Sequence, residues 1–282
     1  MGQEISWRPP DHLYLYAPEG EGLLDLEEIV AYVRGKLGKV RVEIRPSFLS
    51  QILEGAEPED RGRLAQRLAE GMAGLKVRNP LKQDHFPPPL YGEIEYEKER
   101  IEAGRAKSGG ILYDGYRLQE LLGEWIPASE SGLRHLHLIF TCQLFGTWDG
   151  DDLRYHARTS VYGSPALFST MGLVEAPAKP KDFYLLKQQV PASQLDDLAL
   201  LDLKRRFKDR FIDYADERMT EVMKGYVLQA YFGQTMGNPF CEDRGCRLFN
   251  AHWQEEVIYA QLNSPYELCP RHRSLLEQQR KS

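Results

Sequence analysis

The feature that most constrains this sequence is a group of cysteines and one histidine near its C-terminus. Cys241 and Cys246 are followed by Cys269 and His272, in the spacing C-x4-C-x22-C-x2-H. Two close pairs of thiolate or imidazole ligands separated by a loop supply the tetrahedral positions that a structural zinc ion requires. The spacing therefore predicts one structural zinc ion, bound by these four side chains. In the alternative interpretation the cysteines are separate thiols and His272 caps the last helix.

Charge and cysteine usage narrow the class of protein. The 282 residues include 36 basic and 42 acidic side chains, for a net charge of −6. This balance argues against nucleic acid or an anionic membrane surface as the main partner. No segment has the length and hydropathy of a signal peptide or a membrane span. The fourth cysteine, Cys142, lies in the apolar run LIFTCQLF and is predicted to be a small buried side chain. Because no disulfide framework is expected, we predict a cytoplasmic protein.

Alternating strand and helix patterns predict an α/β fold. Segments 13–16, 22–38 and 40–46 have the periodicities of a strand, an amphipathic helix and a strand, so they form a parallel β-α-β unit. We expect a twisted, mostly parallel or mixed sheet of four or five strands with flanking helices, followed by a zinc-stapled helical C-terminal part. The other expected elements are a helix at 60–75, a strand turning into a helix at 111–126, strands at 135–141, 153–163, 166–174 and 182–190, and a turn at 146–152.

The hydrophobic period becomes helical from about residue 192. We therefore expect an α/β part at 1–191 and a helical part at 192–282, within one compact unit. The stretch 77–110 combines several prolines with a highly charged run and ends in a glycine pair. It is interpreted as an irregular surface excursion, because strand patterns resume after it.

The segment that leads into the first cysteine pair resembles the archaemetzincins, a family of metzincin-type zinc peptidases. Their pattern HExxHxxGxxHC aligns without gaps with AYFGQTMGNPFC at 230–241. Gly237 takes the place of the glycine that ends the helix, and Cys241 that of the following cysteine. ELCPRH at 267–272 stands where the family has a C-x-x-C pair, with His272 in place of its last cysteine. The resemblance implies a metallopeptidase fold with a structural zinc ion.

The positions that hold the catalytic metal in that family carry other side chains here. Ala230 and Gln234 stand in place of the two helical histidines, and Phe240 in place of the third. Tyr231 replaces the general-base glutamate, and a phenol cannot take a proton from metal-bound water at neutral pH as a carboxylate does. Leu248 replaces the methionine of the family's turn. The resemblance therefore implies a catalytically degenerate relative that keeps its structural zinc and a groove for a peptide or protein ligand.

Other histidines leave an alternative open. His135 and His137 alternate on one predicted strand, and His156 lies on the next, so they are candidate ligands of an active metal-dependent peptidase or hydrolase. His252 with Glu255 or Glu256 forms a second candidate group. A zinc-ribbon-like nucleic-acid binder is disfavoured by the net charge and by the lack of a basic-aromatic stripe. The predicted strand 153–163 would border the cleft where metzincins bind an extended substrate.

Overall fold

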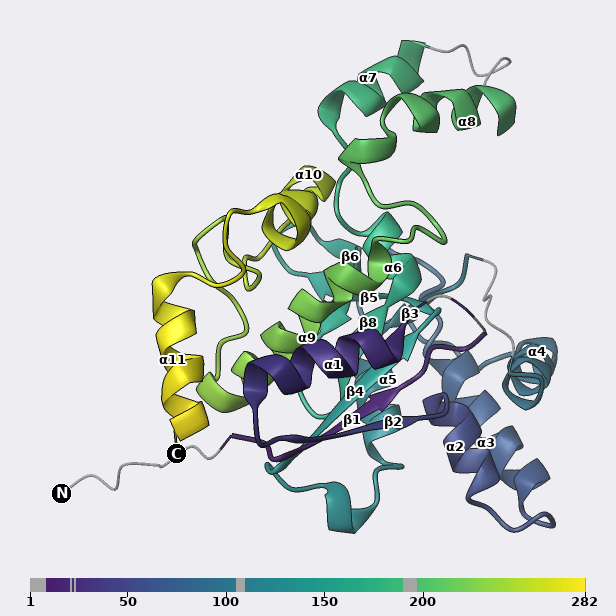
Figure 1. Ribbon diagram of the computed structural model, residues 1–282. Coiled ribbons are helices and arrows are strands. Elements are labelled where there is room, and N and C mark those ends of the chain that lie inside the picture. Colours follow the sequence, from purple (N-terminus) through teal and green to yellow (C-terminus); the bar gives the residue numbers. More distant parts are fainter. Residues whose placement is uncertain (1–8, 21, 23, 105–109, 190–196, 282) are drawn as a thin grey trace.

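The computed structural model describes residues 9–20, 22, 24–104, 110–189 and 197–281 (Figure 1). Its centre is a five-stranded sheet of order β2-β1-β4-β8-β7, in which β7 runs antiparallel to β8 and the other pairs are parallel. A second, three-stranded sheet has the order β3-β5-β6. The strands are β1 (His12–Tyr16), β2 (Arg41–Arg45), β3 (Leu112–Asp114), β4 (His135–Thr141), β5 (Leu144–Asp149), β6 (Arg154–Arg158), β7 (Ser160–Val161) and β8 (Ala166–Ser169).

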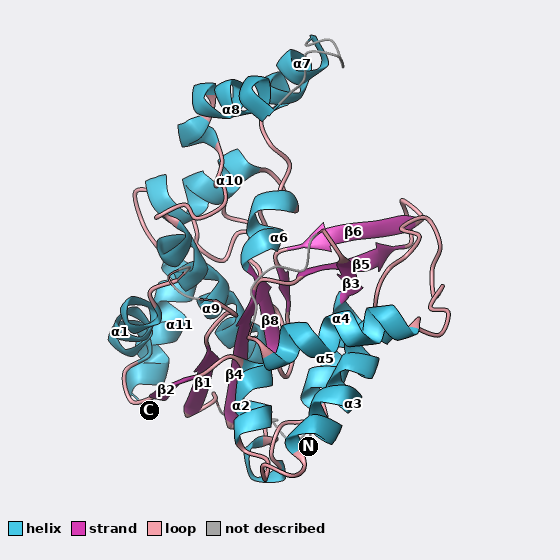
Figure 2. Cartoon of the chain, turned by 90° about the vertical axis from the view of Figure 1, so that its right-hand side faces the viewer, coloured by secondary structure: helices cyan, strands magenta, loops and turns pink. Residues whose placement is uncertain are grey.

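Helices cover both faces of the five-stranded sheet (Figure 2). Leu13 and Leu15 of β1 pack in the core with α1 and α9, whereas Tyr14 and Tyr16 pack on the other side with α2 and α3. This arrangement confirms the predicted α/β class with a mixed sheet. The α-helices are α1 (Leu26–Leu37), α2 (Phe48–Glu54), α3 (Arg61–Gly74), α4 (Tyr91–Glu102), α5 (Gly115–Gly123), α6 (Thr170–Glu175), α7 (Lys181–Gln189), α8 (Asp197–Arg206), α9 (Met219–Met236), α10 (Gln254–Ile258) and α11 (Pro270–Lys281).

The opening β-α-β unit follows from local sequence signals. Asp25 caps α1 by accepting a hydrogen bond from Glu28 N at 2.9 Å, as expected of an N-cap aspartate. Gly38, with φ of 76°, ends the helix through a bond from its amide to Arg34 O. Ile29 and Val33 are fully buried. The predicted helix at 22–38 is thus confirmed, with ends set by these two caps.

Several predicted element types are wrong. Segment 182–190 is not extended: α7 takes up Lys181–Gln189 and buries Phe183 against Phe207 and Phe211. The expected turn at 146–152 begins inside a strand, because β5 extends from Leu144 to Asp149. The second half of 166–174 is α6, since Ser169 caps a helix by accepting from Gly172 N at 2.7 Å.

The charged stretch at 77–110 is only partly a surface excursion. Its helix α4 packs against α3, and Glu97 within it is fully buried. The Glu97 carboxylate forms ion pairs with Lys76 at 2.8 Å and with Arg100 at 2.9 Å. Some of the charged residues in this segment therefore form a buried ionic network. The prediction of a surface excursion does not account for it.

The helices from α7 onward belong to two packing regions, a projecting pair of helices and the main core. The helices α7 and α8 project from the rest of the molecule (Figure 1) around a small core of their own, which includes Phe183 and Leu203. Helix α9, by contrast, packs in the same core as β1, β4 and β8. The two predicted parts of the chain therefore share one hydrophobic core. Within the described ranges, no helix is long and apolar enough to span a membrane.

Candidate metal centre and adjoining groove

The four side chains predicted to bind zinc lie together. One ligand atom from each of Cys241, Cys246, Cys269 and His272 lies within 4.8 Å of every other. The Cys241 and Cys269 sulfurs are 3.9 Å apart, and His272 Nδ1 lies 3.7 Å from Cys246 Sγ and 3.1 Å from Cys269 Sγ. A tetrahedral zinc with bonds of about 2.3 Å to sulfur and 2.0 Å to nitrogen separates its ligands by about 3.5–3.8 Å. The cluster therefore has dimensions that fit a four-coordinate metal ion.

The loop between the first two cysteines is shaped by its own polar groups. Asp243 accepts a hydrogen bond from Gly245 N at 2.9 Å, and its backbone oxygen accepts from Cys246 N at 3.0 Å. The phenol of Tyr266 donates to the same carboxylate at 2.8 Å. A side chain at position 245 would meet Tyr266 Oη at 2.8 Å. Glycine at this position leaves room beside the loop for the hydroxyls of Tyr266 and Ser264.

Helix α11 supplies the second half of the cluster. Pro270 occupies the first helical position, where its missing N–H costs nothing. Cys269 therefore precedes the helix and His272 lies in its first turn, which brings the two side chains together. The ring of Phe232 from α9 packs edge-on against the His272 ring at 5.2 Å. Arg247 N donates to Glu267 O at 2.8 Å and ties the two halves to each other.

Burial sets the protonation of the cluster. Cys246, Cys269 and His272 are all less than 7 % exposed, and none of the cysteines is in a disulfide. Burial raises the pKa of the Cys246 thiol to about 12, so a cation is needed to stabilise the thiolate form. Burial, aided by the charge of Arg271, lowers the pKa of His272. His272 is therefore neutral at pH 7, the form that binds metals.

The end of α9 holds the positions that resemble a catalytic zinc motif. Gly237 ends the helix in the left-handed conformation, with φ of 74° and its amide bonded to Gly233 O, as the motif predicts. The Gln234 amide donates to the backbone oxygens of Leu133 at 2.7 Å and His135 at 3.1 Å. The side chain of Gln234 is thus engaged with the start of β4.

The other three motif positions also have neighbours of their own. Ala230 is buried in the main core. The hydroxyl of Tyr231 donates to Gln279 Oε1 at 3.1 Å, and burial raises the pKa of this phenol to about 12. The Phe240 ring packs edge-on against the Tyr162 ring at 5.6 Å. None of these contacts creates a set of converging ligand atoms.

The strand histidines do not form the alternative metal site. His135 and His137 hydrogen-bond through Nδ1 to the hydroxyls of Tyr14 and Tyr16, at 3.1 and 2.9 Å. Those tyrosines pack on the face of the sheet opposite α9. His156 lies in the other sheet, on β6, next to Asp152 at 2.8 Å. Among the residues with described positions, only the Cys3His cluster brings three or more His, Cys, Asp or Glu side chains close enough together to hold a metal ion.

The second candidate group has a structural explanation. The Glu256 carboxylate accepts from His252 N at 2.9 Å and from Trp253 N at 3.2 Å, which caps the start of α10. Although burial alone would raise the pKa of Glu256, these amides and Arg244 lower it. His252 therefore contributes its backbone, and not its ring, to this arrangement.

A groove of about 390 Å³ lies between the middle of α9 and the edge strands. Its lining includes Ala157 of β6, Val161 of β7, and Phe240 after α9. Tyr162 donates a hydrogen bond to Gln229 at the groove wall. Neither residue stands out in the sequence, because Gln229 precedes the motif and Tyr162 belongs to a strand pattern. The edge strand predicted at 153–163 does border a cleft, as β6 and β7.

Comparison with known proteins places the chain among peptidase relatives. A family model described as "Probable metallopeptidase family (DUF6775)" matches residues 9–279. The match confirms the metallopeptidase relationship that the motif predicts. No functionally curated protein matches the chain. Among solved structures, an archaemetzincin from Methanopyrus kandleri is 18 % identical, with 97 % of each chain covered and a TM-score of 0.44.

Proposed function

We propose that this chain, which belongs to the family described as a probable metallopeptidase family, binds peptides without cleaving them and carries one structural zinc ion. The observation that supports this proposal most directly is the chemistry at the end of α9. Peptide hydrolysis by a metal needs protein ligands, an open coordination position and a base for the attacking water. Ala230 and Phe240 offer no ligand atom, and the Gln234 amide is bonded to two backbone oxygens.

Zinc is the metal that the cluster chemistry favours. Three thiolates and one imidazole form a soft, closed, tetrahedral donor set, which is typical of structural zinc. All four donors come from the protein, so no position is left for a substrate or an activated water. Cys241, Cys246, Cys269 and His272 would therefore hold the ion, and its chemistry would be to link the 241–246 loop to α11.

The groove supports a peptide ligand. Tyr155 donates its amide to Pro80 O at 2.7 Å, away from β5. Backbone groups alternate along an antiparallel ladder, so the amide of Ala157 also points away from β5. Ala157 lines the groove. An extended peptide can therefore add to β6 by backbone hydrogen bonds, with its side chains against Tyr162 and Phe240.

Metal counting tests the loss of the catalytic site. We expect one equivalent of zinc per chain by elemental analysis, lost in Cys269→Ser and kept in Gln234→Ala. We also expect the protein to show no chelator-sensitive cleavage of casein. Two equivalents of zinc, or chelator-sensitive cleavage by a chain that stays folded, would show that an active metal site exists outside the motif.

Peptide capture tests the groove. Immobilised protein is incubated with tryptic peptides of casein, and the retained peptides are identified by mass spectrometry. Ala157→Pro removes the outward amide and is compatible with an edge strand, so we expect capture to fall at least tenfold. Ala157→Ser keeps the amide and serves as the matched control. Equal capture by the two variants would rule out strand addition at β6.

A further inference from the structure

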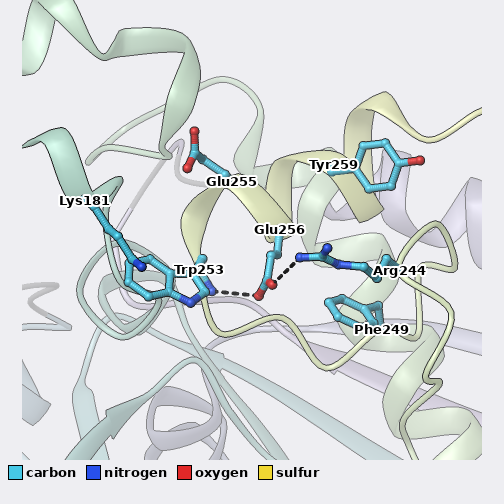
Figure 3. Close-up of a pocket in the computed structure, with 7 residues that line it drawn as sticks. All are labelled: Lys181, Arg244, Phe249, Trp253, Glu255, Glu256 and Tyr259. Carbon is cyan, nitrogen blue, oxygen red and sulfur yellow. Dashed lines mark hydrogen bonds and ion pairs between the residues drawn. The ribbon is translucent and has the colours of Figure 1, made fainter.

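A larger cavity, of about 610 Å³, shares Phe249 with the groove. Its walls come from five places in the chain: the start of α7, the metal loop, Phe249 after that loop, the start of α10, and the π-helix η4 (Tyr259–Asn263). Single-turn π-helices occur often at functional sites because they re-aim side chains. The lining residues, drawn in Figure 3, are Lys181, Arg244, Phe249, Trp253, Glu255, Glu256 and Tyr259.

The acidic side chains of this cavity are already neutralised. Arg244 Nη2 donates to Glu256 at 2.9 Å, and the same carboxylate accepts the two amides at the start of α10. Arg210 Nε donates to Glu255 at 2.9 Å. In Figure 3 the Glu256 carboxylate points toward Arg244, and that of Glu255 points away from both. Neither acid is therefore available to attract a cationic ligand.

Among the residues that the structure describes, none provides an acidic partner for Lys181, the other cation of the cavity besides Arg244. Its neighbour Asp182 is paired with Arg210 at 2.7 Å, and no carboxylate in the described part of the chain lies within 4.0 Å of the Lys181 ammonium. The ammonium instead lies 5.7 Å from the centre of the Trp253 ring. The cavity thus presents an exposed positive charge beside an aromatic surface, completed by Phe249 and Tyr259.

We propose that this cavity binds a ligand in which a carboxylate stands next to an aromatic ring, as at the C-terminus of a peptide that ends in phenylalanine, tyrosine or tryptophan. The carboxylate pairs with Lys181, where a charge-assisted hydrogen bond replaces its solvation. The aromatic side chain packs against Trp253 and its neighbouring rings, in the offset or edge-on geometries that aromatic pairs prefer. A cavity of this size accommodates the terminal residue together with part of the one before it.

This site is distinct from the groove along β6, although Phe249 lines both cavities. Its ligand makes no strand contact and does not depend on Ala157. Loss of binding in Ala157→Pro would therefore concern the groove, whereas loss of the carboxylate preference concerns this cavity. The two proposals fail independently.

Calorimetric titration of the full-length protein with three acetylated peptides tests the proposal. The peptides are Ala-Ala-Ala-Phe with a free carboxylate, the same peptide as its C-terminal amide, and Ala-Ala-Ala-Ala with a free carboxylate. We expect the amide and the alanine peptide each to bind at least about tenfold more weakly than the first. N-acetylphenylalanine that binds as tightly as the first peptide would support the ring-and-carboxylate chemistry and assign the site to small acids.

Variants locate the binding. Lys181→Met should weaken the free-acid peptide about tenfold and leave the amide unchanged, whereas Lys181→Arg should retain the preference. Lys187→Met, on the same helix but outside the cavity, is the matched control. The proposal is overturned if none of the peptides binds, if acid and amide bind equally well, or if Lys181→Met and Lys187→Met behave alike.

Discussion

Two regions of this molecule carry side chains at spacings that other proteins use for metals, and they differ in how those side chains are used. At the C-terminal cluster, three sulfurs and a nitrogen converge within 4.8 Å of one another. At the end of α9, Gln234 and Tyr231 each hydrogen-bond to a different part of the chain. In the first region the ligand atoms converge on one another. In the second region each side chain contacts a different neighbouring segment.

The difference lies in what the side chains of each region contact. Buried thiolates are costly unless a cation balances their charge, so a bound metal ion would hold the four side chains of the cluster together. At the end of α9 the side chains at the motif positions are part of the packing. Phe240 contacts Tyr162, and Ala230 joins the main core. Each contact stabilises the fold a little, and none requires a metal.

The largest expected effect is the loss of one cluster ligand. Cys246→Ser and Cys269→Ser should lose zinc and destabilise the protein by about 4 kcal/mol, the stabilisation that a ligand provides at a thousand times its dissociation constant. Both sulfurs are buried beside core residues of α9, so aggregation during expression is also expected. Zinc content and chemical denaturation measure the effect.

Cys142→Ala is the matched control for those variants. Cys142 is a free, buried cysteine outside the cluster, and its sulfur donates to Glu19 O at 3.1 Å. Its replacement should lower the free energy of unfolding by about 1 kcal/mol and leave the zinc content unchanged. If Cys269→Ser were as stable as Cys142→Ala, the cluster would not be a structural metal site.

Acid should weaken metal binding, and the expected effect is about as large as that of losing one cluster ligand. A thiol binds zinc only after it loses its proton, and burial raises the pKa values of Cys241 and Cys246. The metal-free cluster therefore binds more protons than the metal-bound one, so affinity falls as the pH falls. With three thiols to deprotonate, we expect up to about a thousandfold loss per pH unit. Competition with a fluorescent zinc chelator at pH 6, 7 and 8 measures it, and a pH-independent affinity would contradict thiolate ligation.

The sequence predicts best those elements whose signals are local. The α1 helix has its own caps and apolar stripe, and β4 has a run of apolar residues after its two histidines, so the sequence predicts both within a few residues. The sequence predicts a strand where α7 forms, because the apolar side chains of this helix pack into a small separate core with Phe207 and Phe211. Glu97 could not be recognised as buried, since its partners include Lys76, far from it in sequence.

In the candidate site, too, the parts with local sequence signals are predictable and the others are not. The cluster was predictable because the spacing of Cys241 and Cys246, and of Cys269 and His272, already fixes two close pairs. The grouping of His135 and His137 with His156 was wrong because a strand pattern does not tell which sheet a strand enters. The sequence does not reveal the cavity beside Lys181, because five separate segments line it.

A smaller effect is expected at the motif itself. Gln234→Ala removes two hydrogen bonds to backbone oxygens and should cost about 1–2 kcal/mol. Gln234→His restores the side chain found at this position in the resembled motif. It should not raise the zinc content, because Ala230 and Phe240 still offer no ligand atoms. A second equivalent of zinc in Gln234→His would show that the site is closer to function than its contacts indicate.

The smallest effect is expected at Tyr231. Its hydroxyl donates one hydrogen bond, to Gln279 of α11, at 3.1 Å, so Tyr231→Phe should cost about 0.5–1 kcal/mol. If the hydroxyl serves only to hold α11 against α9, the loss is shared with Gln279→Ala. A double-mutant cycle should then give a coupling energy close to the cost of the single change. Additive losses, or any change in zinc content, would instead point to a role for the phenol that the contact with Gln279 does not explain.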